Sequence, residues 1–169
     1  MKAYFFFVGD VIKEDSKEWP EITKKILSNL VSKGHKIGWH SMHHTHVATR
    51  NQKRLDLQGP DAVISDIQEL KDTLNKVLGF SYKTEVSRMP GGSGTYKTNI
   101  IEAVESQGLR APTFWHIETQ DWENQISTNL ESYVSNILKK KKDYIVLLHE
   151  YSRTGRDLEK FLLEIKKQT

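Results

Sequence analysis

The run AYFFFVG at residues 3–9 carries the clearest structural signal in the sequence. A continuous apolar run of six residues, four of them aromatic and closed by a glycine, is typical of a buried strand. The run is too short for a membrane-spanning helix, which needs about 20 apolar residues. Asp10 ends it too early for a signal peptide, and no small-residue cleavage site follows. We therefore predict a core strand that begins within three residues of the N-terminus.

Segments with helix and strand patterns alternate along the rest of the chain. Apolar residues that recur every three or four positions indicate helices, and short apolar runs bounded by turn residues indicate strands. Helices are predicted at about 20–33, 60–78, 97–107, 126–139 and 158–167, strands at about 36–39, 84–87, 111–116 and 144–148, and a polar loop at 47–59. This alternation favours an α/β fold of parallel β/α units around one sheet or barrel. No linker or repeat divides the chain, so we predict a single domain over residues 1–169.

Composition excludes several classes of protein. The 169 residues contain no cysteine, which excludes a disulfide framework, a thiolate zinc site and a cysteine nucleophile. The formal net charge of +3 is too weak to indicate a nucleic-acid partner. A hydrophobic fraction of 37%, with four Trp, six Tyr and six Phe, indicates a globular protein and not a disordered one.

Titratable residues follow the predicted strands. In β/α architectures the functional residues gather on the loops that follow the carboxyl ends of the strands. The residues in such positions are His40, His44, Arg88, Glu118, Asp121 and His149. Because they come from separate segments that end at one rim, we expect them to form a single site.

His40 and His44 form the strongest local signal. Two imidazoles four residues apart lie on one face of a helical turn and are close enough to bind one divalent cation. Zinc, nickel, cobalt and copper all accept neutral imidazole, so the pair does not fix the metal. The spacing alone is equally compatible with a solvated polar cluster, because His43 and His46 could replace either member of the pair.

Three further segments offer groups for acid–base or oxyanion chemistry. His149 follows the apolar run IVLL at residues 145–148, where it could act as a general acid or base or could be a core histidine bonded to a carbonyl. Asp121 could orient that histidine or could be a surface carboxylate. The turn RMPGG at residues 88–92 could present backbone N–H groups to an oxyanion or could be a plain connection with a surface arginine.

The order of these motifs resembles the polysaccharide deacetylase (NodB-homology) family. The resemblance rests on GHKIGWHSMHH at 34–44, RMPGGS at 88–93, DW at 121–122 and LLH at 147–149, with the strand at 3–9 as a further match. It covers essentially the whole chain. It implies a distorted (β/α) barrel and a hydrolase that removes acetyl groups from glycans such as peptidoglycan or chitooligosaccharides. It also implies a divalent metal, zinc in the first place, with cobalt or nickel as alternatives.

The resemblance assigns roles to individual residues. His40 and His44 match the metal-binding histidines, and His149 matches the general acid. Arg88 matches the arginine that steadies the catalytic aspartate, and Asp121 matches the carboxylate that tunes the catalytic histidine. The matches to substrate-binding positions are Gly91, whose backbone N–H would line an oxyanion hole, Trp122 in the groove and Leu147 beside the acetate pocket.

One motif of the family has no counterpart in the chain. The family's Thr-Phe-Asp-Asp-Gly motif supplies the base and the third metal ligand, but the sequence contains no Asp-Asp pair. We do not expect Asp10 to replace it. We expect either a fragment that lacks the first β/α unit or a degenerate member that binds glycan or metal without turnover. In both cases these 169 residues alone should show activity near background.

Expectations about partners and location follow from the same resemblance. We expect a glycan substrate, no nucleic acid and no membrane span. An extracellular or cell-wall location is implied by the family, and we expect no signal peptide in the chain. A missing first β/α unit would leave the strand at 3–8 as an exposed apolar edge, so we expect self-association through that edge.

Overall fold

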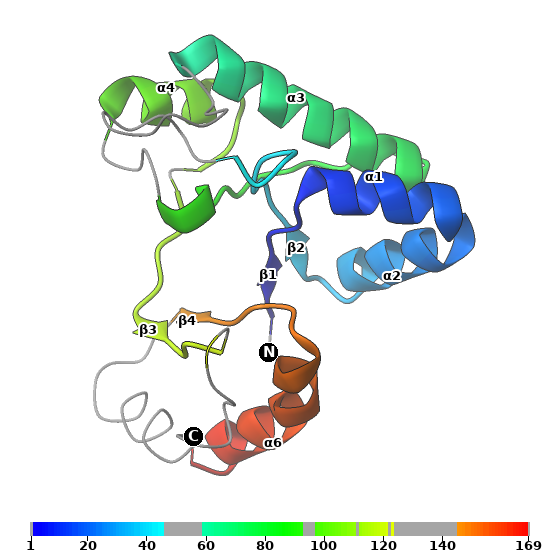
Figure 1. Cartoon of the computed structure of the whole chain (residues 1–169), viewed down its shortest axis with the longest axis vertical. Helices are drawn as coiled ribbons and strands as arrows, with labels where there is room; N and C mark the ends of the chain where they lie inside the picture. Colours follow the sequence, from blue (N-terminus) through cyan, green and yellow to red (C-terminus); the bar gives the residue numbers. More distant parts are fainter. Residues whose placement is uncertain are drawn as a thin grey trace. The chain divides into compact units, whose positions relative to one another are not determined.

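The computed structural model describes residues 2–45, 59–92, 97–110, 112–121, 123 and 145–168. The chain forms two compact units, Met1–Thr113 and Phe114–Thr169 (Figure 1). The helix predicted at 126–139 and nearly all of the loop predicted at 47–59 lie outside the described residues. The division into one domain stays a prediction.

The first unit contains a parallel strand pair. The strands are β1 (Tyr4–Phe5) and β2 (Lys36–Ile37), with Phe5 opposite Ile37. Parallel pairing is what alternating strand and helix patterns predict. Both strands are shorter than expected, and the chain enters a helix at Gly9, soon after β1. The prediction of a buried strand is wrong, because residues 3 and 4 are exposed and residues 5–8 are only half-buried.

Two of the expected strands are reduced or absent in the described residues. The segment 84–87 contributes only a single parallel bridge, between Ser87 and Trp39. The segment 112–116 is not a strand, although Thr113 donates its N–H to the Ser87 carbonyl at 2.7 Å. Further backbone hydrogen bonds of 2.9 Å run from the Arg110 N–H to the Glu85 carbonyl and from the His116 N–H to the Ile145 carbonyl, but no continuous ladder forms in the described part of these segments.

The helix α1 (Gly9–Glu18) is not predicted by the sequence. Its only buried side chain is that of Ile12, so it has almost no apolar periodicity. Its first N–H groups are satisfied from far along the chain: Gly9 donates to the Ser41 carbonyl at 3.1 Å, and Asp10 to the Met42 carbonyl at 2.8 Å. Tertiary contacts, and not local pattern, fix where α1 begins.

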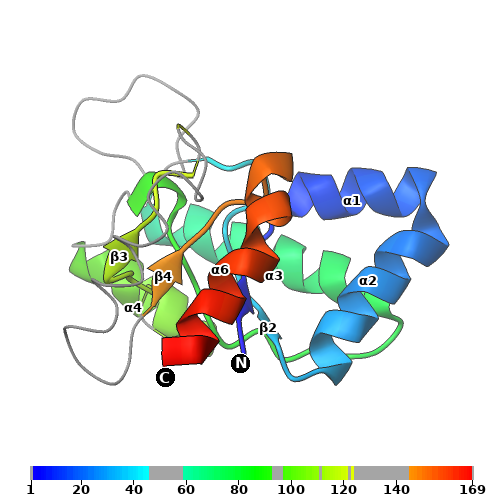
Figure 2. The same ribbon diagram turned by 90° about the horizontal axis from the view of Figure 1, so that it is seen from below.

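The helix α2 (Pro20–Ser32) confirms the prediction at about 20–33. Proline stands at its first turn, where no backbone N–H is needed. Gly34 follows its end with φ of 77°, a conformation that glycine adopts without strain. Trp19 joins α1 to α2, and the two helices form a hairpin (Figures 1 and 2).

The helices α3 (Gly59–Leu78) and α4 (Thr98–Ser106) also confirm their predictions. α3 packs against α1, α2 and α4, which makes it the central helix of this unit (Figure 1). The buried residues of this core include Leu27, Ile37, Trp39, Met42, Val63, Ile67, Leu70, Leu74, Met89 and Ile100. None of the described helices combines the length and apolar character needed to cross a membrane.

The second unit is built on another parallel pair. Strand β3 (Ile117–Glu118) pairs with β4 (Val146–Leu147), with Glu118 opposite Leu147. The helix α6 (Ser152–Gln168) begins six residues before the predicted start at 158. The sequence pattern did not indicate these residues, because the first turn is polar and carries no apolar repeat. Phe161 of α6 is almost fully buried in the small core of this unit. The described strands therefore support a mixed α/β fold with parallel pairs.

Candidate functional site

Residues 40–45, which we call the histidine loop, follow β2 and are fixed through their backbone. The carbonyl groups of Ser41 and Met42 accept the first N–H groups of α1. The Thr45 N–H donates to Ser41 Oγ at 2.9 Å. Just before the loop, Trp39 exchanges backbone hydrogen bonds of 3.0 and 2.9 Å with Val86 and Arg88. These contacts make a rigid support for the histidine side chains.

His40 is buried, and its Nδ1 is held by a backbone carbonyl. Its side chain is 6% exposed, and Nδ1 lies 2.7 Å from the backbone carbonyl oxygen of Arg88. A carbonyl oxygen can only accept, so Nδ1 carries the proton. In the neutral ring Nε2 then holds the lone pair, which is the form that binds a metal ion.

His44 lies next to His40. Their ring centroids are 5.1 Å apart, and the rings meet edge to face. Two imidazoles that bind one zinc at a tetrahedral angle, each through a nitrogen at about 2.1 Å, have centres about 5 Å apart. The pair therefore fits two positions of a metal site. The described residues contain no group of three His, Asp or Glu side chains arranged to complete one.

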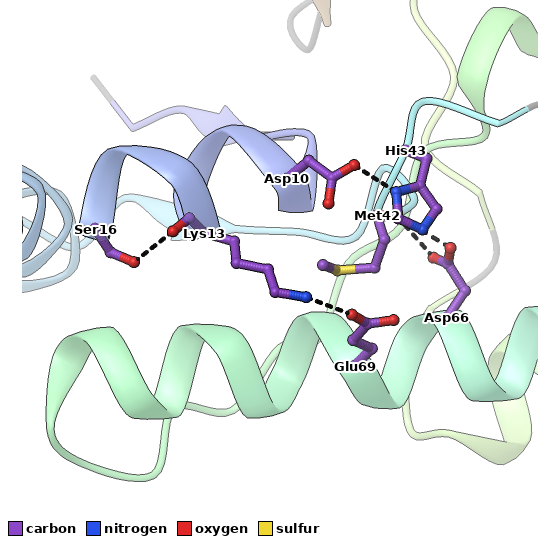
Figure 3. A network of polar contacts seen from close by, with 7 residues as sticks. All are labelled: Asp10, Lys13, Ser16, Met42, His43, Asp66 and Glu69. Atoms are coloured by element: carbon purple, nitrogen blue, oxygen red, sulfur yellow. Dashed lines mark hydrogen bonds and ion pairs between the residues drawn. The ribbon is translucent and has the colours of Figure 1, made fainter. Parts of the chain in front are cut away.

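His43 is engaged elsewhere, which favours His44 as the partner of His40. Its Nδ1 forms an ion pair with the Asp10 carboxylate at the start of α1 (Figure 3). The hydrogen bond to Asp10 raises the pKa of His43 above its usual value. A histidine that favours its protonated form is a poor metal ligand, because the metal needs the lone pair. His46 lies outside the described residues.

Asp66 supports the histidine loop from the middle of α3. Asp66 is 6% exposed, and its carboxylate accepts the Trp39 Nε1–H at 2.6 Å. It also accepts the Met42 N–H at 3.1 Å (Figure 3). Burial raises the pKa of Asp66, while the hydrogen bonds from Met42 and Trp39 act against that rise. The sequence analysis missed this residue. Its position was a signal, since it lies three residues after Val63 and four before Leu70, on the apolar face of the helix.

The Arg88–Gly92 turn lies beside the histidine loop, because the Arg88 carbonyl contacts the His40 ring. Arg88 is half-buried, Met89 and Pro90 are buried, and Pro90–Gly92 forms one 3-10 turn. Gly91 is exposed with φ of 58°, and the turn needs glycine there. The Arg88 carbonyl holds His40, so this turn contributes backbone as well as side chains. The oxyanion role of Gly91 stays a prediction.

The second unit holds a histidine–carboxylate pair. Asp121 is fully buried, and its Oδ1 lies 2.8 Å from His149 Nδ1. Its Oδ2 accepts the His149 backbone N–H at 2.6 Å and the Thr154 hydroxyl at 2.8 Å. With Nδ1 on the carboxylate, Nε2 is the ring nitrogen that can exchange a proton with a substrate. The structure thus brings together two residues that the sequence placed 28 positions apart.

The electrostatics of Asp121 favour the carboxylate. Burial acts to raise the pKa of Asp121, but the hydrogen bonds from His149 and Thr154 outweigh it and hold the pKa below its usual value. Thr154 is a further residue that the sequence analysis missed, because it places the last helix from 158. Leu147, predicted to lie beside an acetate pocket, is 8% exposed. Trp122 lies outside the described residues.

Backbone strain is concentrated at these two places. Among the described residues, three other than glycine have positive φ: Ser41 at 62°, His44 at 52° and Gln120 at 51°. Two of them lie in the histidine loop, and the third directly precedes Asp121. Such residues cost about 1–3 kcal/mol each and persist where the surrounding structure enforces them, often at functional sites.

Comparisons with known proteins identify the family that the chain resembles. A sequence profile of the polysaccharide deacetylase family matches residues 1–112. A peptidoglycan-N-acetylglucosamine deacetylase of Bacillus cereus is 28% identical over 99% of this chain and 70% of its own length. A putative polysaccharide deacetylase of Bacillus subtilis is 25% identical over 99% of this chain, which spans only 55% of that relative.

Solved structures share the fold at low identity. A CE4 family pseudoenzyme from Bacillus anthracis superposes with a TM-score of 0.72 at 20% identity, covering 99% of this chain and 52% of that one. A family 4 carbohydrate esterase from Streptomyces lividans, solved with acetate, gives a TM-score of 0.70 at 15% identity, covering 99% and 75%. One fold thus holds both a protein described as a pseudoenzyme and one described as an esterase, so the fold alone does not decide activity.

Proposed function

The chain belongs to the polysaccharide deacetylase family, and from this premise we propose that it contributes to a metal-dependent hydrolase that removes acetyl groups from N-acetylated glycans. Peptidoglycan is the substrate class that the relatives' names support, and chitooligosaccharides are a further class that the family resemblance implies. The fold proposed for it is a distorted (β/α) barrel. The reaction adds water to the acetyl carbonyl carbon, breaks the C–N bond and leaves acetate and a free amine.

The His149–Asp121 pair is the observation that carries this proposal. Breaking an amide requires a proton for the departing nitrogen, because an amide anion is a very poor leaving group. A histidine held through Nδ1 by a buried carboxylate can supply that proton from Nε2, with its positive charge balanced before the transfer. A core histidine bonded to a carbonyl would lack this charge balance.

His40 and His44 are proposed to bind the divalent metal, zinc in the first place and cobalt or nickel as alternatives. The Nδ1–H of His40 on a carbonyl and the separation of the two rings support this role. When bound, the cation would polarise the acetyl carbonyl and lower the pKa of water. Arg88 is proposed to orient an aspartate, and the Gly91 N–H to donate to the developing oxyanion. Trp122 and Leu147 are proposed to line the groove and the acetate pocket.

A non-catalytic glycan-binding protein is the second candidate. It is favoured by the absence of any Asp-Asp pair in the sequence, which leaves these residues without the family's base and third ligand. Glycan binding that survives both His149→Ala and a chelator, with no acetate released, would support this candidate over the first.

Acetate release from N-acetylglucosamine oligomers and peptidoglycan tests the proposal. The 169 residues should be near background with zinc, cobalt or nickel. A chimera preceded by a β/α unit that carries the family's Asp-Asp motif should release acetate. The matched control is the same chimera with the aspartates of its Asp-Asp motif changed to Asn. An inactive chimera with all three metals would contradict the enzyme proposal, and robust turnover by the 169 residues alone would show that no further base is needed.

Location and self-association are also proposals. The family favours an extracellular or cell-wall protein. Within the described residues β1 pairs only with β2, and Tyr4 is 45% exposed on this pair. An unpaired apolar strand edge is a template for another chain, so we expect the isolated polypeptide to associate. Light scattering at high concentration checks this, and a clean monomer would contradict it.

A further inference from the structure

A single carboxylate in α3 fixes the residues on both sides of His40. Asp66 accepts the indole N–H of Trp39, which precedes His40, and the backbone N–H of Met42, which follows it by two residues. The acceptor belongs to α3, and the two donors are the first and the last residue of the segment 39–42. Asp66 therefore holds residues 39–42 as one unit.

The contacts of this segment lead directly to the His40 ring. The Trp39 carbonyl accepts the Arg88 N–H, and the Arg88 carbonyl accepts His40 Nδ1–H. The position of Trp39 thus determines where the Arg88 carbonyl stands relative to the His40 ring. A shift of the Trp39 indole or of the Met42 backbone would change that 2.7 Å contact.

A buried carboxyl at this position is not explained by packing alone. The face of α3 around Asp66 is apolar, with Val63, Ile67 and Leu70 all buried. Taking a carboxylate out of water is unfavourable, and an apolar residue of similar volume often stabilises such a position at least as well. Other carboxylates near the loop lie on the surface, where Asp10 pairs with His43 and Glu69 pairs with Lys13 (Figure 3).

We propose that Asp66 is a positioning residue for His40: by binding Trp39 and Met42 together, it holds the histidine loop so that the His40 ring keeps Nδ1–H on the Arg88 carbonyl and the ligand lone pair on Nε2. The ligand part rests on the metal-dependent function proposed above. The positioning part does not, because it concerns the conformation of the metal-free chain.

Two substitutions remove the hydrogen bonds of Asp66 to different extents, and a third substitution serves as the matched control. Asp66→Asn keeps the volume and one acceptor oxygen but turns an N–H donor toward Met42 or Trp39, so one of the contacts weakens. Asp66→Ala removes all of them. Glu69→Gln makes the same loss of charge one turn along α3, at a surface ion pair whose side chains are 46% and 47% exposed.

The first measurement needs no metal. Long-range proton–nitrogen NMR correlations report which ring nitrogen of His40 carries the proton. The wild type and Glu69→Gln should show a single Nδ1–H tautomer. Asp66→Asn should show a mixture of tautomers and Asp66→Ala a larger change, each at a pH where the chain is folded by circular dichroism. A purely structural role would lower the melting temperature and leave the His40 tautomer of the folded chain unchanged, which would overturn the proposal.

The second measurement is Co²⁺ binding by calorimetry, with His40→Ala as the reference for a lost ligand. Losing a residue that orients a metal ligand typically weakens binding about 10–100-fold, so we expect about 10-fold for Asp66→Ala and about 3-fold for Asp66→Asn. Glu69→Gln should bind like the wild type. Wild-type affinity in a folded Asp66→Ala variant would overturn the proposal.

If the wild type binds no Co²⁺ but the tautomer still changes in Asp66→Asn, the metal function fails and the positioning role stands. If Asp66→Ala does not fold, Asp66→Asn decides both measurements.

Discussion

His40 in the first unit and His149 in the second are both held through Nδ1, but by acceptors of different charge. His40 donates to a neutral backbone carbonyl at 2.7 Å, and His149 contacts the Asp121 carboxylate at 2.8 Å. A carbonyl fixes the neutral ring with its lone pair on Nε2, which suits a metal ligand. A carboxylate also stabilises the doubly protonated ring, which suits a general acid. The two proposed roles, metal ligand and general acid, therefore differ because the group that contacts Nδ1 differs: a neutral carbonyl at His40 and a carboxylate at His149.

Removing the charge behind His149 should have the largest effect. In the chimera that restores the first β/α unit, Asp121→Asn should lower acetate release about 100-fold or more, because the ring loses both its orientation and its balancing charge. Steady-state kinetics measure the loss, with His149→Ala as the reference. If Asp121→Asn keeps more than a third of the activity, the carboxylate is not what distinguishes His149 from His40.

A steric change should disturb the histidine loop and leave the second unit unaffected. A Cβ at Gly9 would lie 2.2 Å from Met42 Sδ and 3.0 Å from Met42 Cα, so the loop must shift. We expect Gly9→Ala to lower the free energy of unfolding by about 3 kcal/mol. Urea denaturation measures this, and NMR of the His40 ring should show an altered tautomer while the His149 signals stay in place.

The matched control for that change is Gly155→Ala in α6. A Cβ at Gly155 would meet no atom within 4 Å, and the residue lies within a helix. We expect the free energy of unfolding to stay the same or rise by up to about 1 kcal/mol. Equal losses from the two substitutions would show that contact with Met42 is not the cause.

A smaller effect is expected from the hydroxyl that supports Asp121. Thr154→Val removes the 2.8 Å hydrogen bond to Oδ2 at nearly constant volume. The free energy of unfolding should fall by about 1–2 kcal/mol at pH 7, whereas Thr154→Ser should retain most of the stability. Urea denaturation of the three chains checks this, and an equal loss in both variants would point to packing of the methyl group.

The difference in the free energy of unfolding between the wild type and Thr154→Val should depend on pH. The hydrogen bonds lower the pKa of Asp121 in the folded chain, so their stabilisation is complete above the unfolded value of about 3.9 and is lost as pH falls through the folded value. The difference between the wild type and Thr154→Val should therefore shrink below about pH 4. A difference that is constant from pH 7 to pH 3 would contradict a role for the Asp121 charge.

The smallest effect is expected at the surface of the histidine loop. Asp10→Asn removes the ion pair with His43, whose side chains are 37% and 58% exposed. Exposed pairs contribute little, so the free energy of unfolding should change by no more than about 0.5 kcal/mol, and Co²⁺ affinity should stay within about 2-fold. A loss of Co²⁺ affinity as large as that of Asp66→Ala would make Asp10 part of the support of His40.

The helices that the sequence predicted correctly are those with apolar faces. α2, α3 and α4 each repeat apolar residues every three or four positions, and that pattern is local. α1 and the first turn of α6 escaped prediction because their positions are set by contacts with distant residues. The N–H groups of α1 are accepted by the histidine loop, and Thr154 of α6 donates to Asp121.

Residue type and spacing alone were enough to predict the family and the residues that carry its motifs. The sequence also determined the parallel β/α pattern, because alternating periodicities are visible in the chain. The hydrogen-bond partners that hold each histidine are known only from the folded chain. The Arg88 carbonyl is 48 residues from His40, and Asp66 is 24 residues from Met42. No local pattern encodes such pairs, because they exist only once the strand pair and α3 have packed and brought the donors and acceptors within hydrogen-bond distance.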